Sequence, residues 1–501
     1  MISMVFSGLL GALSFPPLPL FVLAWVMFIP WFVAIEQGKR KFIYGFVSGL
    51  VYHGFTLHWI AANSALSLWA ATATALLAIV YLSIWWGLIF QSVAYQYSHV
   101  GRPAFLQIPL MLALVEYITS FWDLGFPWVA LGVTQLSFPT PGIFATVGVF
   151  GATIWVGAMN FLIYMAIRRN KWRLLAIATG LVLLLLPFMG EKLNEQVLYP
   201  TGDSLLVAVI QPNLDPHVKW SAPCDSVMAL NMALFDQAQM RGAELIVFPE
   251  TAAPLYLNRS ARWRLALRQA ASENQVTIAI GALASQFLKE QKQIFNSVFF
   301  FDATTHSLRY DKVQLVPFGE RFPFQRWLPS LGSINLGQAE FAPGCREPVL
   351  QLMDSTLAVA PTICFESIFQ QLFNERVRLG ANLLINITND GWYRNTLEPA
   401  QHFAQSQIRA IETGRPLVRA ANNGISAVLD GWGNTIAILP VEQQDILICN
   451  VPLLGGESIY LSWGRPLMRL TLLCVALYLL MFYGSVSWRS KVSKKKKNAL
   501  I

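Results

Sequence analysis

The sequence predicts an α-helical membrane bundle joined to an α/β domain. Residues 1–190 consist of long apolar stretches with few charges, and another apolar stretch covers 466–485. Between them, residues 200–460 alternate strand-like and helix-like segments. Hydrophobic residues make up 55% of the 501-residue chain and charged residues only 13%, about half the charged share of an average soluble domain. These observations favour a membrane protein that carries a large globular domain.

The apolar stretches predict eight membrane-spanning helices, because a helix needs roughly 20 apolar residues to cross the hydrocarbon core. Pro16 and Pro17 separate the first two helices, since proline lacks an N–H donor and breaks helices. The expected spans are 3–15, 18–36, 43–63, 68–96, 104–122, 141–167, 172–190 and 466–485. The domains that follow from them are a seven-helix region at 1–190, a globular domain at 200–460, an eighth span at 466–485 and a basic tail at 486–501.

Lysine and arginine lie in alternate loops of the predicted bundle. Basic clusters follow the second, fourth, sixth and eighth spans, whereas the loops after the first, third and fifth contain none. Because such residues concentrate in cytoplasmic loops, we expect both termini in the cytoplasm. The globular domain then lies in the periplasm of a Gram-negative cell, anchored to the inner membrane. These loops and the tail contribute much of the net charge of +8 and face anionic lipid, so we expect no nucleic-acid partner.

The five cysteines give no sign of a metal site. None forms a CxxC pair, and no histidine and cysteine spacing is typical of zinc. Cys474 lies inside the last expected span and is interpreted as packing. An oxidising periplasm permits a disulfide, for example between Cys224 and Cys345, although nothing in the sequence requires one. Cys364 has the best context for a chemical role.

Runs rich in valine and isoleucine recur through 200–460, with helical segments between them. This alternation predicts sheets that are covered by helices. Two stacked sheets with outer helices and a single doubly wound sheet both fit the pattern. The expected strands are 204–211, 244–248, 276–281, 296–302, 307–314, 357–363, 381–388, 417–420 and 426–430, and the helices include 228–242, 261–274 and 399–413.

Three short motifs, far apart in the chain, each contain one reactive side chain. Glu250 and Cys364 end apolar strand-like runs, and Lys312 precedes another apolar run. A reactive group at the end of a buried strand is held rigidly and can face a cleft. A thiol needs a base to become a nucleophile, and the oxyanion that it creates needs a positive charge. We therefore predict one site with Cys364 as the nucleophile, Glu250 as the base and Lys312 as the cation.

The motifs resemble those of the nitrilase, or carbon–nitrogen hydrolase, superfamily in their order and spacing. They read Phe248-Pro-Glu250-Thr, Tyr310-Asp-Lys312-Val and Thr362-Ile-Cys364-Phe-Glu366-Ser, and the stretches 316–320, 389–392 and 414–424 agree as well. The resemblance implies an αββα sandwich and a Glu-Lys-Cys triad. Seven spans before this domain and one after it make the whole chain similar to the apolipoprotein N-acyltransferase family.

The resemblance to that family implies two substrates. The acyl donor is a phospholipid, usually phosphatidylethanolamine, and the acceptor is the α-amino group of the diacylglyceryl-cysteine that begins an apolipoprotein. The sn-1 acyl chain is expected to pass through a thioester on Cys364 in a ping-pong mechanism, as the last step of lipoprotein maturation. No metal or organic cofactor is implied, and we expect the protein to be a monomer.

Five further residues are expected to support the triad. Glu320 and Glu366 match two more carboxylates of the family and are expected to position the lysine and the substrate amine. The backbone N–H of Phe365 is expected to be a second oxyanion donor, although the family frequently has tyrosine at this position. Trp220 and Trp392 match family positions near the lipid site.

Two other functions fit parts of the sequence. A membrane-anchored amidase or nitrilase that hydrolyses a small carbon–nitrogen substrate has the same triad, but it uses water as the acceptor and does not need eight spans. A transporter or scaffold with an inactive nitrilase-like domain usually has polar residues or broken repeats within its spans. The spans of this chain contain few polar residues and the triad is intact, so this function ranks last.

An apolar loop at 322–331 lies between two of the motifs. Exposed aromatic side chains suit the interface between membrane and water. We expect Phe324, Trp327 and Leu328 to enter the outer leaflet and to admit an acyl chain.

Overall fold

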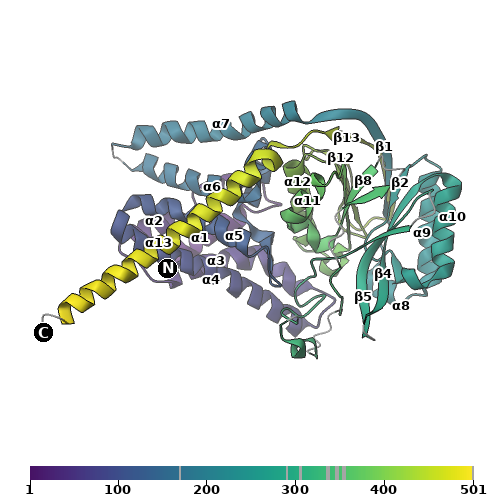
Figure 1. Ribbon diagram of the computed structural model, residues 1–501, viewed down its shortest axis with the longest axis horizontal. Helices are drawn as coiled ribbons and strands as arrows, with labels where there is room; N and C mark the ends of the chain where they lie inside the picture. The colour runs from purple at the N-terminus through teal and green to yellow at the C-terminus, as the bar shows by residue number, and fades with distance from the viewer. Residues whose placement is uncertain are drawn as a thin grey trace.

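The computed structural model describes residues 1–168, 171–288, 291–303, 307–325, 327–333, 339–344, 349–352 and 357–498. Figure 1 shows two parts beside each other along the long axis: a group of helices, and a pair of sheets with helices on their outer faces. The chain enters the sheet part through α7 (Arg173–Val197) and returns through α13 (Arg465–Asn498). Segments from both ends of the sequence therefore form the helical part.

The helical part is packed around large aromatic side chains. Trp31, Trp86 and Phe90 are buried, and the rings of Trp86 and Phe90 lie edge-on to Trp31 with centroids 5.8 and 5.2 Å away. Small residues permit close helix contacts, as at Gly45, where an added Cβ would lie 2.3 Å from the Trp86 carbonyl oxygen. The other helices of this part are α1 (Ile2–Leu13), α2 (Ile29–Glu36), α3 (Ile43–Leu57), α4 (Leu68–Val100), α5 (Gln107–Ile118) and α6 (Gly142–Ile167).

Four helices in the described part of the chain are long and apolar enough to cross a membrane: α4, α6, α7 and the segment Tyr460–Ser485. The other expected spans, 3–15, 18–36, 43–63 and 104–122, are shorter or broken. The stretch 18–36, for example, divides into a 3-10 turn at Phe21–Trp25 and the eight-residue α2, which has a proline in its first turn. Helix length therefore supports four of the eight predicted spans. Hydropathy depends on composition alone and does not detect such breaks in the backbone. This explains why eight spans were expected where four long helices are found.

Two sheets form the centre of the other part. The first has the strand order β13-β1-β2-β4-β5-β6, with β3 beside β4, and the second has the order β12-β11-β10-β9-β8-β7. The strands of the first sheet are β1 (Tyr199–Gln211), β2 (Leu245–Val247), β3 (Ala253–Tyr256), β4 (Thr277–Leu288), β5 (Gln291–Phe301), β6 (Ser307–Asp311) and β13 (Asp445–Gly455). Those of the second are β7 (Leu350–Leu352), β8 (Leu357–Ile363), β9 (Leu383–Thr388), β10 (Leu417–Ala421), β11 (Ser426–Leu429) and β12 (Thr435–Leu439).

The sheets are stacked on each other through an apolar core. Val207, Val247 and Phe300 of the first sheet share this core with Val359 and Ile385 of the second. Helices α9 (Cys224–Gln239) and α10 (Ala261–Asn274) lie outside the first sheet, and α11 (Gln370–Arg378) and α12 (Glu398–Thr413) outside the second (Figure 1). The domain is therefore an αββα sandwich, and the single doubly wound sheet is excluded.

Helix α12 joins the sandwich to the helical part. The indole N–H groups of Trp59 and Trp128 both donate to Gln401 Oε1, at 3.0 and 2.9 Å. Gly148, with φ of +70°, kinks α6, and the backbone N–H of Val149 donates to Glu412 Oε1 at 2.7 Å. Only glycine adopts such a backbone readily, so the kink supplies a donor that a regular helix would have used internally.

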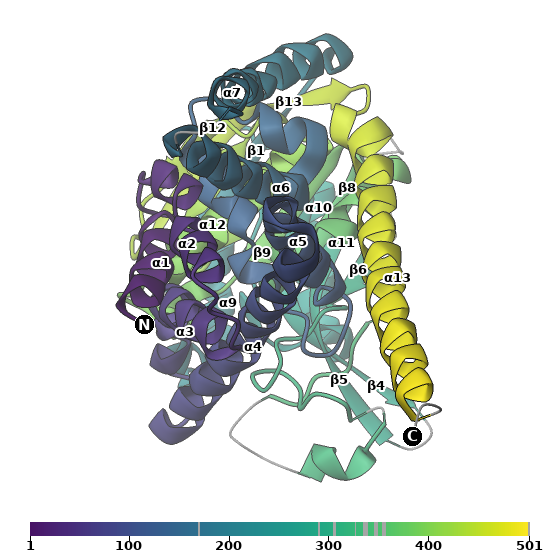
Figure 2. The ribbon, with the colours of Figure 1, turned by 90° about the vertical axis from the view of Figure 1, so that its left-hand side faces the viewer.

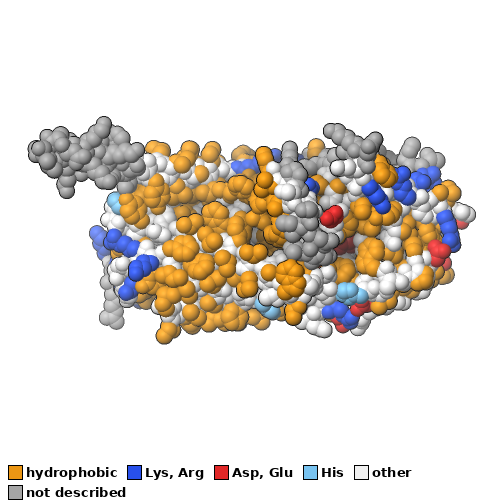
Figure 3. All heavy atoms as spheres, turned by 90° about the horizontal axis from the view of Figure 1, so that it is seen from below, with side chains coloured by type: hydrophobic (Ala, Val, Ile, Leu, Met, Phe, Trp, Pro, Cys, Tyr) orange, Lys and Arg blue, Asp and Glu red, His pale blue; other side chains and the backbone are white. Residues whose placement is uncertain are grey.

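Exposed apolar side chains cover much of the helical part. Figure 3 shows them spread over this half of one face, while charged side chains gather on the sandwich half and at the opposite end. Helix α13 contributes several of them and runs along one side of the helical part (Figure 2). An apolar surface of this kind marks contact with a membrane or with another protein. The basic tail at 486–498 continues α13 as helix.

Candidate active site

Glu250, Lys312 and Cys364 lie together at one end of the sandwich, where they line the same cavity. Glu250 follows β2, Lys312 directly follows β6, and Cys364 directly follows β8. The first two strands belong to one sheet and the third to the other. The site is therefore held by the packing of the two sheets, which brings together groups more than 50 residues apart in the sequence.

Lys312 lies between two carboxylates. Its Nζ donates to Glu320 Oε1 at 2.8 Å and is 3.8 Å from Glu250 Oε1. Burial disfavours the charge on this lysine, but Glu320, Cys364 and Glu250 together raise the pKa of Lys312 above its ordinary value. Lys312 is therefore an ammonium ion at neutral pH, suited to stabilise a developing oxyanion.

Glu250 is buried, and its Oε1 accepts a hydrogen bond from Asn296 Nδ2 at 2.6 Å. Burial raises the pKa of Glu250 above its ordinary value, with Glu320 adding to this effect and Lys312 opposing it. A raised pKa makes a carboxylate a better proton acceptor near neutral pH. Asn296 Nδ2 also lies 3.3 Å from Glu320 Oε1, so one amide orients both carboxylates.

Cys364 has a left-handed backbone, with φ of +51°, at the turn from β8 into the 3-10 helix Cys364–Ile368. Such a conformation is uncommon for a residue other than glycine and is typical of functional sites. Burial raises the pKa of the Cys364 thiol well above its ordinary value, and Glu250 and Asp390 add to this, while Lys312 lowers it. The resting thiol is therefore protonated and needs a base.

Glu366 holds the turn at Cys364 to the segment that follows Lys312. Its Oε1 accepts from the Tyr310 hydroxyl at 2.8 Å and from two backbone N–H groups, those of Val313 and Gln314, at 2.7 and 3.0 Å. Its Oε2 accepts from the Ile363 backbone N–H at 2.8 Å. Glu320 contacts the lysine side chain directly, whereas Glu366 acts on the backbone of both motifs.

A buried polar cluster contacts the backbone of Cys364. His402 Nε2 donates to the Cys364 carbonyl oxygen at 3.1 Å, and His402 Nδ1 lies 3.0 Å from Asp390 Oδ1. Arg419 donates to Asp390 Oδ2 at 2.9 Å. Burial and Arg419 oppose charge on His402, but Asp390 and Glu398 raise the pKa of this imidazole.

Asp390, Glu398 and His402 bring three ligand atoms within 4.8 Å of one another, a spacing compatible with a metal ion. The Arg419 guanidinium already lies 2.9 Å from Asp390 Oδ2 and 3.0 Å from His402 Nδ1. A cation therefore already occupies this cluster, and the donor set does not fit a metal.

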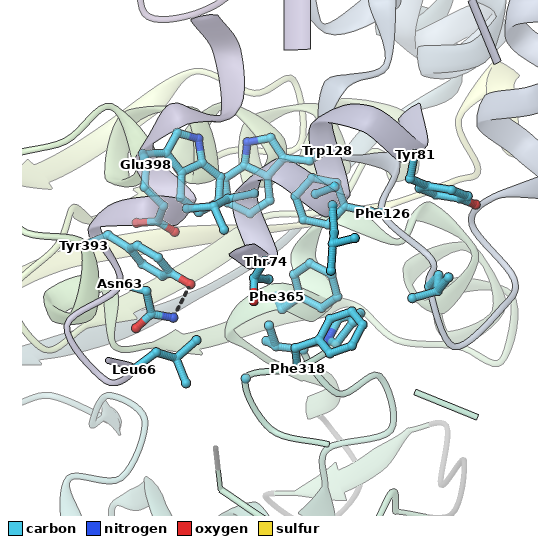
Figure 4. A pocket seen from close by; sticks show the side chains of 18 of the residues that line it. Asn63, Leu66, Thr74, Tyr81, Phe126, Trp128, Phe318, Phe365, Tyr393 and Glu398 are labelled. Atoms are coloured by element: carbon cyan, nitrogen blue, oxygen red, sulfur yellow. Dashed lines mark hydrogen bonds between the residues drawn. The ribbon is translucent and has the colours of Figure 1, made fainter. Parts of the chain in front are cut away.

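Two cavities meet at Cys364. One, of about 250 Å³, is mainly apolar and lies between the helical part and the sandwich. Figure 4 shows Phe126 and Trp128 on one side of it and Leu66 and Phe318 on the other. The second, of about 440 Å³, is more polar and contains the triad. Cys364, the predicted nucleophile, thus lines an apolar and a polar cavity at once.

The remaining expected residues divide between the two cavities. Phe365 is buried in the wall of the apolar cavity, where its ring stacks on Phe126 with centroids 5.9 Å apart. Trp220 and Trp392 line the polar cavity. The disulfide that the sequence permits, between Cys224 and Cys345, involves a residue outside the described part of the chain.

Several residues of the site could not be identified from the sequence. Asn296, Tyr393 and Glu398 line the polar cavity but lie in no motif whose chemistry marks them. Asn296 had a weak signal in the strand pattern, because Asn296 and Ser297 are the two polar residues in the mainly apolar run 294–301. Glu398 gave no comparable signal, because it reads as an ordinary acidic residue in the first turn of a helix.

Family models match both parts of the chain. Residues 206–458 match the family model described as carbon–nitrogen hydrolase, and residues 7–162 match that of the apolipoprotein N-acyltransferase N-terminal domain. An amidase of the nitrilase superfamily from Nesterenkonia AN1 has a similar structure, with a TM-score of 0.39 and 20% identity over 54% of this chain and 97% of that one. Because the family model covers residues 206–458, the sandwich with its clustered Glu, Lys and Cys is a domain of the carbon–nitrogen hydrolase family.

The relatives define the family further. The apolipoprotein N-acyltransferase of Geobacter metallireducens is 32% identical over 475 residues, which cover 92% of this chain and 91% of that protein. That of Shewanella oneidensis is 28% identical over 514 residues, covering 96% and 95%. The chain therefore belongs to the apolipoprotein N-acyltransferase family and is an N-acyltransferase. The resemblance noted from the motifs is confirmed.

Proposed function

We propose that this enzyme transfers the sn-1 acyl chain of phosphatidylethanolamine to the N-terminal amine of the S-diacylglyceryl-cysteine of apolipoproteins, as the last step of lipoprotein maturation. The reaction is a ping-pong exchange through a thioester on Cys364. The observation that carries the proposal is the apolar cavity that ends at Cys364. The part of an acyl chain next to its ester can lie in this cavity with the ester carbonyl at the thiol, whereas a small amide does not need an apolar cavity of this kind.

In the first half-reaction, Glu250 accepts the Cys364 thiol proton as the sulfur attacks the ester carbonyl carbon. The ammonium of Lys312 and the backbone N–H of Phe365 stabilise the tetrahedral oxyanion. The intermediate collapses by breaking the bond to the glycerol oxygen, which takes the proton from Glu250. The lyso-phospholipid leaves, and the acyl chain stays on sulfur as a thioester.

In the second half-reaction, the acceptor ammonium group first releases a proton to solvent, and the resulting neutral amine attacks the thioester carbonyl carbon. Glu250 takes a proton from the attacking nitrogen, and Lys312 again stabilises the oxyanion. The carbon–sulfur bond breaks, and the Cys364 thiolate takes the proton from Glu250. A thioester suits this step because thiolate is a good leaving group, and the products are an amide and the free enzyme.

The substrates also require a location at a membrane. The apolar surface of the helical part and its four long apolar helices support insertion into the bacterial inner membrane. The alternation of basic loops supports cytoplasmic termini and a periplasmic sandwich domain. The apolar cavity, lined partly by α4 and partly by the sandwich, then lies where a bilayer phospholipid can reach it.

Intact mass spectrometry after incubation with phosphatidylethanolamine tests the proposal. The wild type and a Cys449→Ala control, which removes a different half-buried thiol, should each gain one acyl chain. Cys364→Ala should gain none, and a diacylglyceryl-cysteine peptide should remove the adduct from the wild type. An adduct that persists in Cys364→Ala would contradict the thioester. Ammonia release from small amides, without any adduct, would favour an amidase instead.

A further inference from the structure

The polar cavity beside Cys364 carries an excess of acidic groups. Its charged lining comprises three carboxyl side chains, Glu250, Glu320 and Glu398, and one ammonium, Lys312, together with the titratable ring of His217. Lys312 contacts Glu250 and Glu320 but has no contact with Glu398 in the described structure. The lining therefore contains more carboxyl groups than cations, and the buried Lys219, whose Nζ donates to Thr251 Oγ1 at 2.8 Å, adds a second positive charge near Glu250.

Glu398 is the acidic group of this cavity that the proposed reaction does not use. It begins α12, is only 3% exposed and, like Cys364, lines both cavities. Its Oε1 lies 3.3 Å from His402 Nδ1, but its buried Oε2 has no hydrogen-bond partner among the described residues. Figure 4 shows the carboxyl group next to the ring of Tyr393, on the same side as Asn63. An unpaired buried carboxylate oxygen is costly, so a bound group that supplies a donor would be stabilised there.

The neighbours of Glu398 are already engaged with one another. Asp390 is paired with Arg419, and His402 contacts both Asp390 and the Cys364 carbonyl oxygen. Burial, with a contribution from Asp390, raises the pKa of Glu398 to about 7, while His402 and Arg419 oppose the rise. At neutral pH this carboxyl group is therefore present in both its protonated and its charged form, and a bound cation would favour the charged form.

Aromatic side chains also line the polar cavity. Trp220, Trp392 and Tyr393 line the same cavity, and aromatic faces attract ammonium ions. We propose that Glu398 is the counter-ion for a primary ammonium group of a substrate, held in the polar cavity beside Cys364. This inference rests on the proposed function, in which the phosphatidylethanolamine headgroup and the acceptor N-terminus both carry such a group.

Single-turnover kinetics of Glu398→Gln in the full-length protein test this role. Three rates are compared with the wild type: acylation of Cys364 by phosphatidylethanolamine, acylation by phosphatidylglycerol, which lacks an ammonium group, and release of the acyl chain by a diacylglyceryl-cysteine peptide. Loss of one charge-assisted contact should slow an ammonium-dependent step about 10- to 100-fold. Acylation by phosphatidylglycerol should change less than about twofold.

The pattern of rates identifies the source of the ammonium. A defect confined to phosphatidylethanolamine acylation assigns Glu398 to the donor headgroup, and one confined to acyl release assigns it to the acceptor. For the affected substrate, the wild-type KM should rise as the pH falls through about 7, because Glu398 becomes neutral, and the variant should lose this dependence. Unchanged rates, or an equal loss in all three, would overturn the inference. A wild type that forms no thioester with either phospholipid would instead refute the proposed function.

Discussion

Replacing Glu366 by glutamine should loosen the turn that presents the nucleophile. Glu366 is fully buried, and its two oxygens accept four hydrogen bonds. The amide oxygen of glutamine can keep the three donors on the Oε1 side. Its NH₂ group must then face the Ile363 backbone N–H, so two donors oppose each other directly before Cys364. The substitution preserves shape and removes one acceptor.

The expected loss of stability follows from the hydrogen bond that the substitution removes. Losing a hydrogen bond to a charged acceptor and leaving a buried N–H unpaired should lower the free energy of unfolding by about 3 kcal/mol. For a domain of this size, such a loss corresponds to a fall of about 6 to 12 °C in the unfolding midpoint. Thermal unfolding of the full-length protein in detergent measures the midpoint, and single-turnover acylation measures the displacement of Cys364, which should slow the step at least tenfold.

The control is Glu273→Gln, which changes an exposed carboxylate whose side chain accepts only from Gln269 in the described structure. This variant should keep both the midpoint and the acylation rate. If Glu366→Gln matched the control within about 1 °C and twofold in rate, the reasoning from its four hydrogen bonds would be refuted. A normal midpoint with slow acylation would show that the contact positions the nucleophile without stabilising the domain.

Two other predictions concern the base and the aromatic loop. Lys219 is buried, with its pKa lowered to about 8 by burial, and its charge lowers the pKa of Glu250. In Lys219→Met, the pKa of Glu250 should therefore rise. Because Glu250 must be deprotonated to act as a base, the acid limb of the acylation pH–rate profile should move to higher pH. An acid limb that does not move would exclude this coupling between Lys219 and Glu250. Phe324, Trp327 and Leu328 are exposed, as expected for the loop. Changing all three to serine should slow acylation by phospholipid in bilayers by about tenfold and leave acylation by detergent-dispersed phospholipid intact; equal rates on bilayers would contradict membrane entry by the loop.

Much of the site could be anticipated because its chemistry lies in local motifs. Glu250 and Cys364 follow apolar strand runs, and a strand in a buried sheet fixes the direction of the residue at its end. The alternation of strand-like and helix-like runs likewise indicated an α/β domain. It did not distinguish two stacked sheets from a single sheet. Eight spans were expected because hydropathy averages over a window, and four of them proved too short or interrupted in the structure.

The sequence by itself determined which groups can react: a thiol, a carboxylate and an amine at the ends of apolar runs, within a chain whose other half is apolar helix. Only the tertiary structure decided what these groups face. The stacking of two sheets places Lys312 between Glu250 and Glu320, and the docking of α12 on the helical part closes an apolar cavity against Cys364. Glu398, at the start of α12, lines the polar cavity although it belongs to none of the three motifs. Cavities and charge balances arise from segments distant in the chain, and no local pattern records them.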